Sequence, residues 1–157
     1  MSLFEPWSEE RTVEIVNDHA HLEGPLMPIL HAAQAVFGHV PEDAVPVIAR
    51  EMNLSRAEVH GVVTFYHDFR QELAGKHVLK LCRAEACQSM GCERLVERAE
   101  DKLGVECGHT SADGRVTLEA VYCLGLCATA PSAIIDGRLV GRLDPAKLDA
   151  ILKEAQA

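Results

Sequence analysis

The sequence of 157 residues contains no long apolar run and no basic leader, and it has few positive charges overall. Its apolar runs fall well below the roughly 20 residues that span a bilayer, so we expect no membrane insertion. The first ten residues, MSLFEPWSEE, carry acidic side chains where a secretory signal peptide carries basic ones, and they contain no apolar core. We therefore expect a cytoplasmic protein.

Positive charge is scarce, because 15 Lys and Arg stand against 24 Asp and Glu and leave a net charge of −9. A net-acidic chain repels phosphate, so nucleic acid is not expected as a partner. Also absent are the P-loop, the G-x-G-x-x-G turn, the G-x-S-x-G elbow and the H-E-x-x-H metal pair. We therefore assign no catalytic residue to this chain.

The composition that is present, 48% apolar and 25% charged, is typical of a globular protein, and the length fits one domain or two small ones. The charge is unevenly spread, with a net −8 in residues 1–75 and −1 in residues 76–157. All six cysteines lie in the second part, and a helical pattern gives way to a β pattern near Gly75. We predict two domains, a helical bundle over 1–75 and a second domain over 76–157.

Local signals predict four helices in the first domain. The predicted spans are 8–22, 26–37, 44–52 and a fourth helix that begins at Ser55. Ser55 and Glu58 form the S-x-x-E capping box, and Leu54 and Val59 occupy the positions of a hydrophobic staple. Helices of this length are marginal alone, so we expect them to pack together or against a partner.

The second domain alternates strands and helices. The predicted elements are a strand at 77–82, a helix capped by Ser89 and ended by Gly104, strands at 116–123, 132–135 and 138–140, and a last helix opened by Asp144 and Pro145. The Asp136-Gly137 pair predicts a hairpin turn between the last two strands. The order β-α-β-β-β-α predicts an α/β fold in which both helices cover a sheet.

Four of the cysteines form two short pairs, Cys82-x4-Cys87 and Cys123-x3-Cys127, separated by 35 residues. Each pair starts at the C-terminal end of a predicted strand, so two neighbouring strand ends would bring four thiolates around one point. A [2Fe–2S] cluster needs four such ligands together with backbone N–H donors to the sulfurs. Gly125 would allow a close approach of the backbone. The spacing therefore predicts a four-thiolate metal centre.

Other uses of these cysteines are weighed against the cluster. A structural zinc site also takes four cysteines, usually with two to four residues inside each pair, and stays open as an alternative. Disulfides need an oxidising compartment, for which the sequence gives no sign. A redox dithiol needs C-x-x-C, which is absent, and Cys107-Gly108-His109 matches only half of a Rieske pattern.

Two cysteines remain outside the predicted ligand set. Cys92 falls on the apolar face of its predicted helix with Leu95 and Val96, where a free cysteine acts as a small hydrophobe. Cys107 has no partner nearby in the sequence. A chain with one redox centre and no sign of a substrate pocket is predicted to be an electron carrier or a subunit.

Three segments of the sequence resemble a known family. They are LSRAEVHGVVTFYHDF at 54–69, GKHVLKLCRAEAC at 75–87 and VYCLGLCATAP at 121–131. They are similar to the thioredoxin-like [2Fe–2S] ferredoxin family, which includes the 24-kDa or E-type subunit of respiratory complex I. The resemblance covers nearly the whole chain and implies a small N-terminal helical bundle followed by a thioredoxin-like domain.

The resemblance also implies a ligand set and partners. The residues that match the family's cluster ligands are Cys82, Cys87, Cys123 and Cys127, which favours iron over zinc. The family implies a neighbouring subunit that carries FMN and binds NAD(H), with the cluster of this chain near the flavin.

The loop CRAEACQSMG resembles the gamma subunit of NAD-dependent formate dehydrogenases, since complex I subunits usually carry Thr and Pro there. It implies a larger molybdenum- or tungsten-containing formate dehydrogenase subunit in the assembly. The alternatives are the equivalent subunit of complex I or of an NAD-reducing hydrogenase, and, in another class, a zinc-stapled interaction module. A DNA-binding redox regulator is disfavoured by the −8 charge of residues 1–75.

Overall fold

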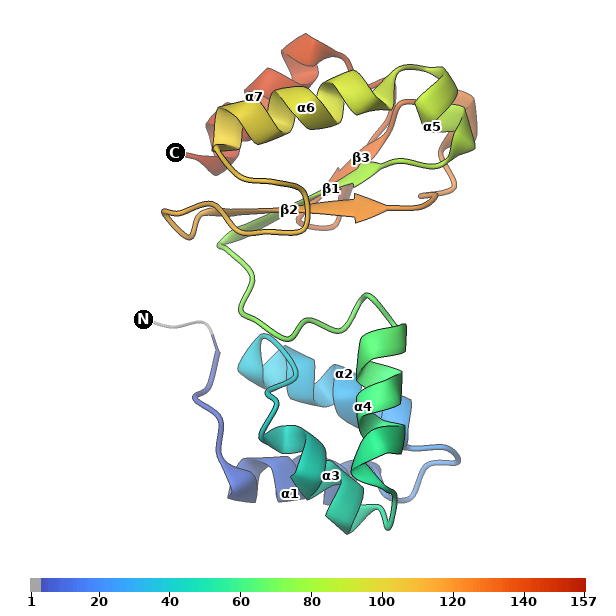
Figure 1. Ribbon diagram of the computed structural model, residues 1–157, viewed down its shortest axis with the longest axis vertical. Coiled ribbons are helices and arrows are strands. Elements are labelled where there is room, and N and C mark those ends of the chain that lie inside the picture. The colour runs from blue at the N-terminus through green and yellow to red at the C-terminus, as the bar shows by residue number, and fades with distance from the viewer. Residues whose placement is uncertain (1–3) are drawn as a thin grey trace. The chain divides into compact units, whose positions relative to one another are not determined.

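The computed structural model describes residues 4–157. The chain divides into two compact units, Met1–Leu73 and Ala74–Ala157 (Figure 1). Among the described residues of the first unit, helices alone make up the regular structure, and the second unit is a sheet with helices, which is the predicted α/β class. No helix within residues 4–157 is both long and apolar enough to cross a bilayer.

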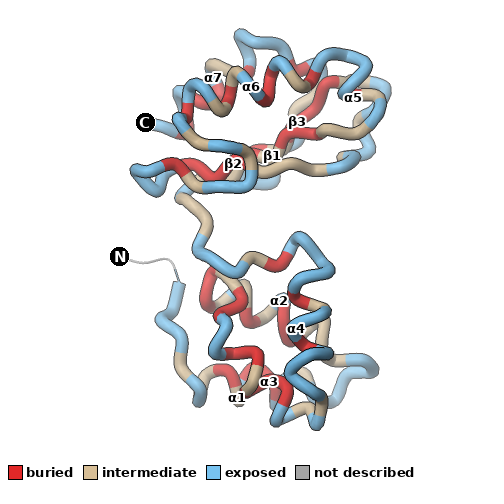
Figure 2. The backbone as a smooth tube through the Cα atoms, in the orientation of Figure 1, coloured by how far each residue is buried: buried red, intermediate tan, exposed pale blue. Residues whose placement is uncertain are grey.

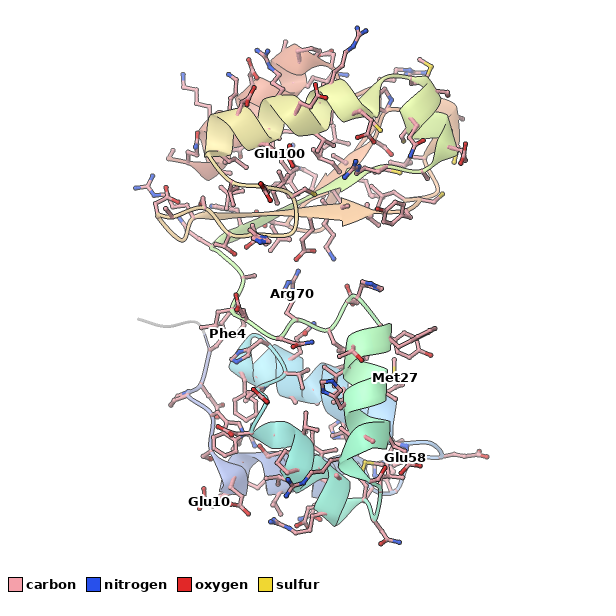
Figure 3. The ribbon with its side chains drawn as sticks, in the orientation of Figure 1. Phe4, Glu10, Met27, Glu58, Arg70 and Glu100 are labelled. Atoms are coloured by element: carbon pink, nitrogen blue, oxygen red, sulfur yellow. The ribbon has the colours of Figure 1, made fainter. Side chains whose placement is uncertain are left out.

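The helices of the first unit follow one another along the chain, and a side chain caps the start of the first and of the last of them. They are α1 (Glu9–His19), α2 (Leu26–Phe37), α3 (Ala44–Glu51) and α4 (Arg56–Phe65). Ser8 caps α1 by accepting from the N–H of Arg11 at 3.1 Å. The capping box of α4 is confirmed, because Ser55 Oγ accepts from the N–H of Glu58 and Glu58 Oε2 accepts from the N–H of Ser55. Glu58 is labelled in Figure 3.

The first unit has its own apolar core, which all four of these helices supply (Figure 2). Its largest fully buried side chains are Phe37, Ile29, Leu30, Ile48, Val40 and Val59. α2 ends at Gly38, which takes φ 79°, a left-handed conformation that suits glycine. Helices of 8 to 12 residues are stable here because they bury one face each against the others.

The second unit is a four-stranded mixed sheet with helices on one face (Figure 1). Its elements are β1 (His77–Cys82), α5 (Glu85–Ser89), α6 (Cys92–Leu103), β2 (Val116–Val121), the 3-10 turn η1 (Cys127–Thr129), β3 (Ala133–Ile135), β4 (Arg138–Val140) and α7 (Pro145–Ala155). The strand order is β2-β1-β3-β4; β1 and β2 run parallel, and the other pairs are antiparallel. The alternate residues Leu79 and Leu81 of β1 meet α6 and α7 in a single core.

One predicted helix start is wrong. Ser89 does not cap the long helix; it is the last residue of the short helix α5, and its Oγ donates to the carbonyl of Ala86 at 2.8 Å. Gly91, at φ 83°, separates α5 from α6, which begins at Cys92. The left-handed glycine turns the chain between two helices that would otherwise run on as one.

Several predicted ends move by one to three residues. α1 stops at His19 and α3 at Glu51, while β3 starts at Ala133. β2 stops at Val121, because Cys123 takes φ 91° and leaves the extended conformation. The early end of β2 shapes the second cysteine loop.

Candidate metal centre

The two cysteine pairs lie at one edge of the sheet of the second unit. β1 and β2 are parallel neighbours, and Cys82 at the end of β1 lies opposite Val121 at the end of β2. The loops that follow, 82–87 and 122–127, therefore leave the sheet side by side. Sequence spacing alone predicted two strand ends, and the parallel register shows that they are adjacent.

The two pairs differ in exposure. Cys82 and Cys87 are each only 2% exposed and pack with partly buried Val121 and Leu124, whereas Cys123 and Cys127 are exposed. Cys87 lies on α5, and its Sγ is 3.6 Å from the Oγ of Ser132. The site thus has a buried side and a side open to the surroundings.

The sulfurs of the exposed pair are close enough to share one metal. Cys123 Sγ and Cys127 Sγ are 3.7 Å apart. Two thiolates on one tetrahedral metal with bonds of about 2.3 Å lie about 3.75 Å apart. The N–H of Gly125 donates to Cys123 Sγ at 3.4 Å, and Gly125 takes φ 74°, which folds the loop back on itself.

Backbone N–H groups are directed at the buried sulfur of Cys82. Burial raises the pKa of this thiol, but N–H donors from Ala84, Cys123 and Leu124 and the side chain of Cys87 outweigh it, so the pKa is lowered. Hydrogen bonds to the charged form favour a thiolate. The residue is thereby prepared to act as an anionic sulfur ligand.

The four sulfurs also affect one another. The pKa of Cys127 is raised, first by its hydrogen bond with Cys123 and the charge of that residue, and then by burial and by the charges of Cys87 and Cys82. Thiolates that interact in this way repel one another unless a cation lies between them. The donor set therefore fits a cationic centre with an affinity for soft sulfur ligands.

A zinc site and a [2Fe–2S] cluster differ in how they share four thiolates. Among residues 4–157, no three His, Cys, Asp or Glu side chains converge on a point where one metal ion could be held. A mononuclear zinc site needs four sulfurs around one point. A [2Fe–2S] cluster takes four thiolates shared between two irons, which matches a pair on each of two loops.

Cys92 and Cys107, the two cysteines outside the predicted ligand set, differ in their surroundings. Cys92 is 3% exposed and lies with Cys82 and Cys87 in one buried cluster. Burial first, then the charges of Glu93 and the neighbouring cysteines, raise its pKa to about 11, so it stays a neutral thiol near pH 7. Cys107 packs half-buried at the edge of the core of the second unit, and burial raises its pKa.

Sequence reasoning missed the groups that surround the cysteine loops. Arg83 donates to both carboxylate oxygens of Glu93, and Ser132 lies beside Cys87. Arg83 and Glu93 are ten residues apart with a short helix between them, so no helical spacing pairs them. Ser132 reaches the site only through the antiparallel pairing of β1 with β3.

Comparisons with known proteins point to one family. The model of the thioredoxin-like [2Fe-2S] ferredoxin family matches residues 12–156. The NADP-reducing hydrogenase subunit HndA of Solidesulfovibrio fructosivorans is 32% identical over 142 residues, which are 90% of this chain and 83% of that protein. The E 2 subunit of the NADH-quinone oxidoreductase of Rhizobium meliloti is 37% identical over 132 residues, which are 84% of this chain and 79% of that protein.

A solved structure shares the fold. The crystal structure of an NAD+-reducing [NiFe]-hydrogenase in the air-oxidized state matches 83% of this chain with a TM-score of 0.70 and 26% sequence identity. The chain spans only 22% of the hydrogenase chain that it matches.

Proposed function

This chain belongs to the thioredoxin-like [2Fe-2S] ferredoxin family, and on that premise we propose that it is the electron-transfer subunit of an NAD-dependent formate dehydrogenase. The broader class is an electron-transfer [2Fe–2S] subunit of an NAD-dependent oxidoreductase. The observation that carries the broader class is the meeting of the two cysteine loops at the paired ends of β1 and β2.

We propose that Cys82, Cys87, Cys123 and Cys127 hold the cluster. A bound [2Fe–2S] cluster accepts and returns one electron. The residues of this chain hold it in place and set its surroundings: the N–H groups of Ala84, Cys123 and Leu124 donate to Cys82, and the buried pair is shielded from water. Hydrogen bonds and burial of this kind tune a reduction potential.

The rest of the reaction is assigned to other chains. We propose a partner subunit that carries FMN and binds NAD(H), and a larger subunit with molybdenum or tungsten where formate is oxidised, all in the cytoplasm. We also propose the division into a helical bundle over 1–75 and a [2Fe–2S] domain over 76–157. The loop at 82–91, CRAEACQSMG, supports the formate branch by its resemblance to gamma subunits of formate dehydrogenases.

A second candidate is the equivalent subunit of an NAD(P)-reducing hydrogenase or of NADH-quinone oxidoreductase. It is favoured by the identities to HndA and to the Rhizobium meliloti protein, and by the structural likeness to an NAD+-reducing hydrogenase. In that case the large partner would hold nickel, or the complex would include membrane subunits.

Two measurements test the proposal. The purified chain, loaded anaerobically with iron and sulfide, is expected to bind two irons and two sulfides and to show a [2Fe–2S] EPR signal after dithionite reduction. Colourless protein with one zinc would refute the cluster.

The complex isolated through a tag on this chain is expected to contain molybdenum or tungsten and to reduce NAD with formate. A complex that contains nickel and reduces NAD or NADP with hydrogen would replace the formate assignment with the hydrogenase. A complex that contains membrane subunits and reduces quinone with NADH would replace it with NADH-quinone oxidoreductase.

A further inference from the structure

Arg83 is fixed by three different elements of the second unit. Its backbone N–H donates to the carbonyl of Val121, at the end of β2, at 2.9 Å. Its carbonyl accepts from Nε2 of Gln88, on α5, at 2.9 Å. Its guanidinium donates to Glu93, on α6, with Nε 3.1 Å from Oε1 and Nη2 2.6 Å from Oε2.

These elements are the ones that carry or lead into the predicted ligands. Arg83 directly follows Cys82, α5 carries Cys87, and β2 leads through Val121 to Cys123. One residue therefore connects the backbone of the first cysteine loop to the start of the second. Glu93, in the first turn of α6, fixes the side chain of that residue to the helix.

The chemistry of the pair points to a role in geometry. A guanidinium and a carboxylate joined by two parallel hydrogen bonds fix both distance and orientation, which a lysine ammonium cannot do. The side chains of Arg83 and Glu93 are 33% and 45% exposed, so the pair adds little to the stability of the whole unit. Its effect is concentrated on the loop that it holds.

We propose that Arg83 and Glu93 form a clamp that positions the loop 82–87 around the cluster and thereby sets the reduction potential and the retention of the cluster. This inference rests on the proposed ligand set. Without the clamp, the loop gains freedom and the buried sulfurs of Cys82 and Cys87 meet more water. A more polar environment favours the more highly charged, reduced cluster, so the potential rises.

The chain contains a matched control pair. Arg98 on α6 donates to Asp149 on α7, with Nε 2.8 Å from Oδ1 and Nη2 2.7 Å from Oδ2. These side chains are 41% and 31% exposed, close to the values of the clamp. This second pair joins two helices away from the cysteine loops, so it reports the general effect of losing a bidentate ion pair on α6.

The test uses the full chain loaded with iron and sulfide, as wild type and as Arg83→Lys, Glu93→Gln, the double variant and Arg98→Lys. Arg83→Lys keeps the charge and removes the fork, which separates positioning from electrostatics. We measure the midpoint potential by EPR-monitored titration, the g values of the reduced signal, and the rate of iron loss to a chelator. Circular dichroism of each apo variant checks that the fold is retained.

At a fixed applied potential, we expect Arg83→Lys to raise the ratio of reduced to oxidised cluster at least threefold. This ratio corresponds to a midpoint potential that is higher by about 28 mV for one electron. Iron loss is expected to be at least threefold faster, and the double variant is expected to add little to the single ones, because the two residues act as one unit. Arg98→Lys is expected to match the wild type in all three measurements. Wild-type potential and iron loss in Arg83→Lys, or equal changes in Arg98→Lys, would overturn the clamp. Failure of the wild type to bind iron would instead refute the proposed function.

Discussion

Cys87 and Cys92 have different predicted roles but similar surroundings. Replacing each of them by alanine therefore separates the loss of a ligand from the loss of packing. They are 2% and 3% exposed and belong to the same buried cluster, so each substitution removes one sulfur from equivalent packing. Deleting one buried heavy atom costs about 1 kcal/mol. We therefore expect the two apo variants to be destabilised equally, by roughly 2–4 °C in Tm for a chain of this size.

The two variants are expected to diverge once the cluster is loaded. Cys87→Ala removes a predicted ligand, whereas Cys92 is held as a neutral thiol by its burial and by Glu93, with a pKa of about 11. Metal binding free energy adds to folding free energy. A hundredfold loss of cluster affinity therefore removes about 2.8 kcal/mol of the stabilisation, and Cys87→Ala is expected to melt roughly 6–11 °C below Cys92→Ala when both are loaded.

The assay combines two readouts on each variant. Iron and sulfide are counted per chain after anaerobic loading, and thermal unfolding is followed with and without the cluster. Cys92→Ala is expected to keep two irons and the reduced EPR signal, and Cys87→Ala to lose both. If Cys92→Ala loses the signal and Cys87→Ala keeps it, the ligand assignment is wrong. If both variants keep it, neither cysteine is a ligand.

Two further predictions concern stability. Gly61 lies inside α4, and apart from the neighbouring backbone of that helix no atom of residues 4–157 would lie within 4 Å of a β-carbon at this position. Gly61→Ala is therefore expected to stabilise the chain by about 1 kcal/mol, and a fall in Tm would refute this. Arg98 and, after it, Lys102 hold the pKa of Asp149 below its ordinary value. The ionised Asp149 therefore stabilises the folded chain fully above about pH 4, and this stabilisation is lost as the pH falls further. Asp149→Asn is thus expected to lower Tm at pH 7, by a difference that shrinks below pH 4; a difference that is constant with pH would contradict the ion pair.

Much of the local structure could be predicted, because its signals lie within a few residues of one another. The capping box at Ser55, the glycine stop at Gly104 and the cap of α7 at Asp144 all act over one helical turn. The prediction failed at Ser89, where a short helix and a left-handed Gly91 interrupt the expected single helix. A serine followed by an apolar face suits a helix start, and only the path of the cysteine loop decides against it.

Periodicity and capping are local properties, so the amino-acid order was enough to predict most of the helices and strands, the change of pattern near residue 75 and the spacing of two cysteine pairs. The assignment of these four cysteines as ligands stays a prediction. The folded chain was needed to show that β1 and β2 are parallel neighbours, so that the two loops meet, and that one pair is buried and the other exposed. It was also needed to show that Arg83 meets Glu93 across a short helix. Strand order, burial and side-chain contacts of this kind involve residues that are distant in the chain. They depend on how the sheet and the helices pack together.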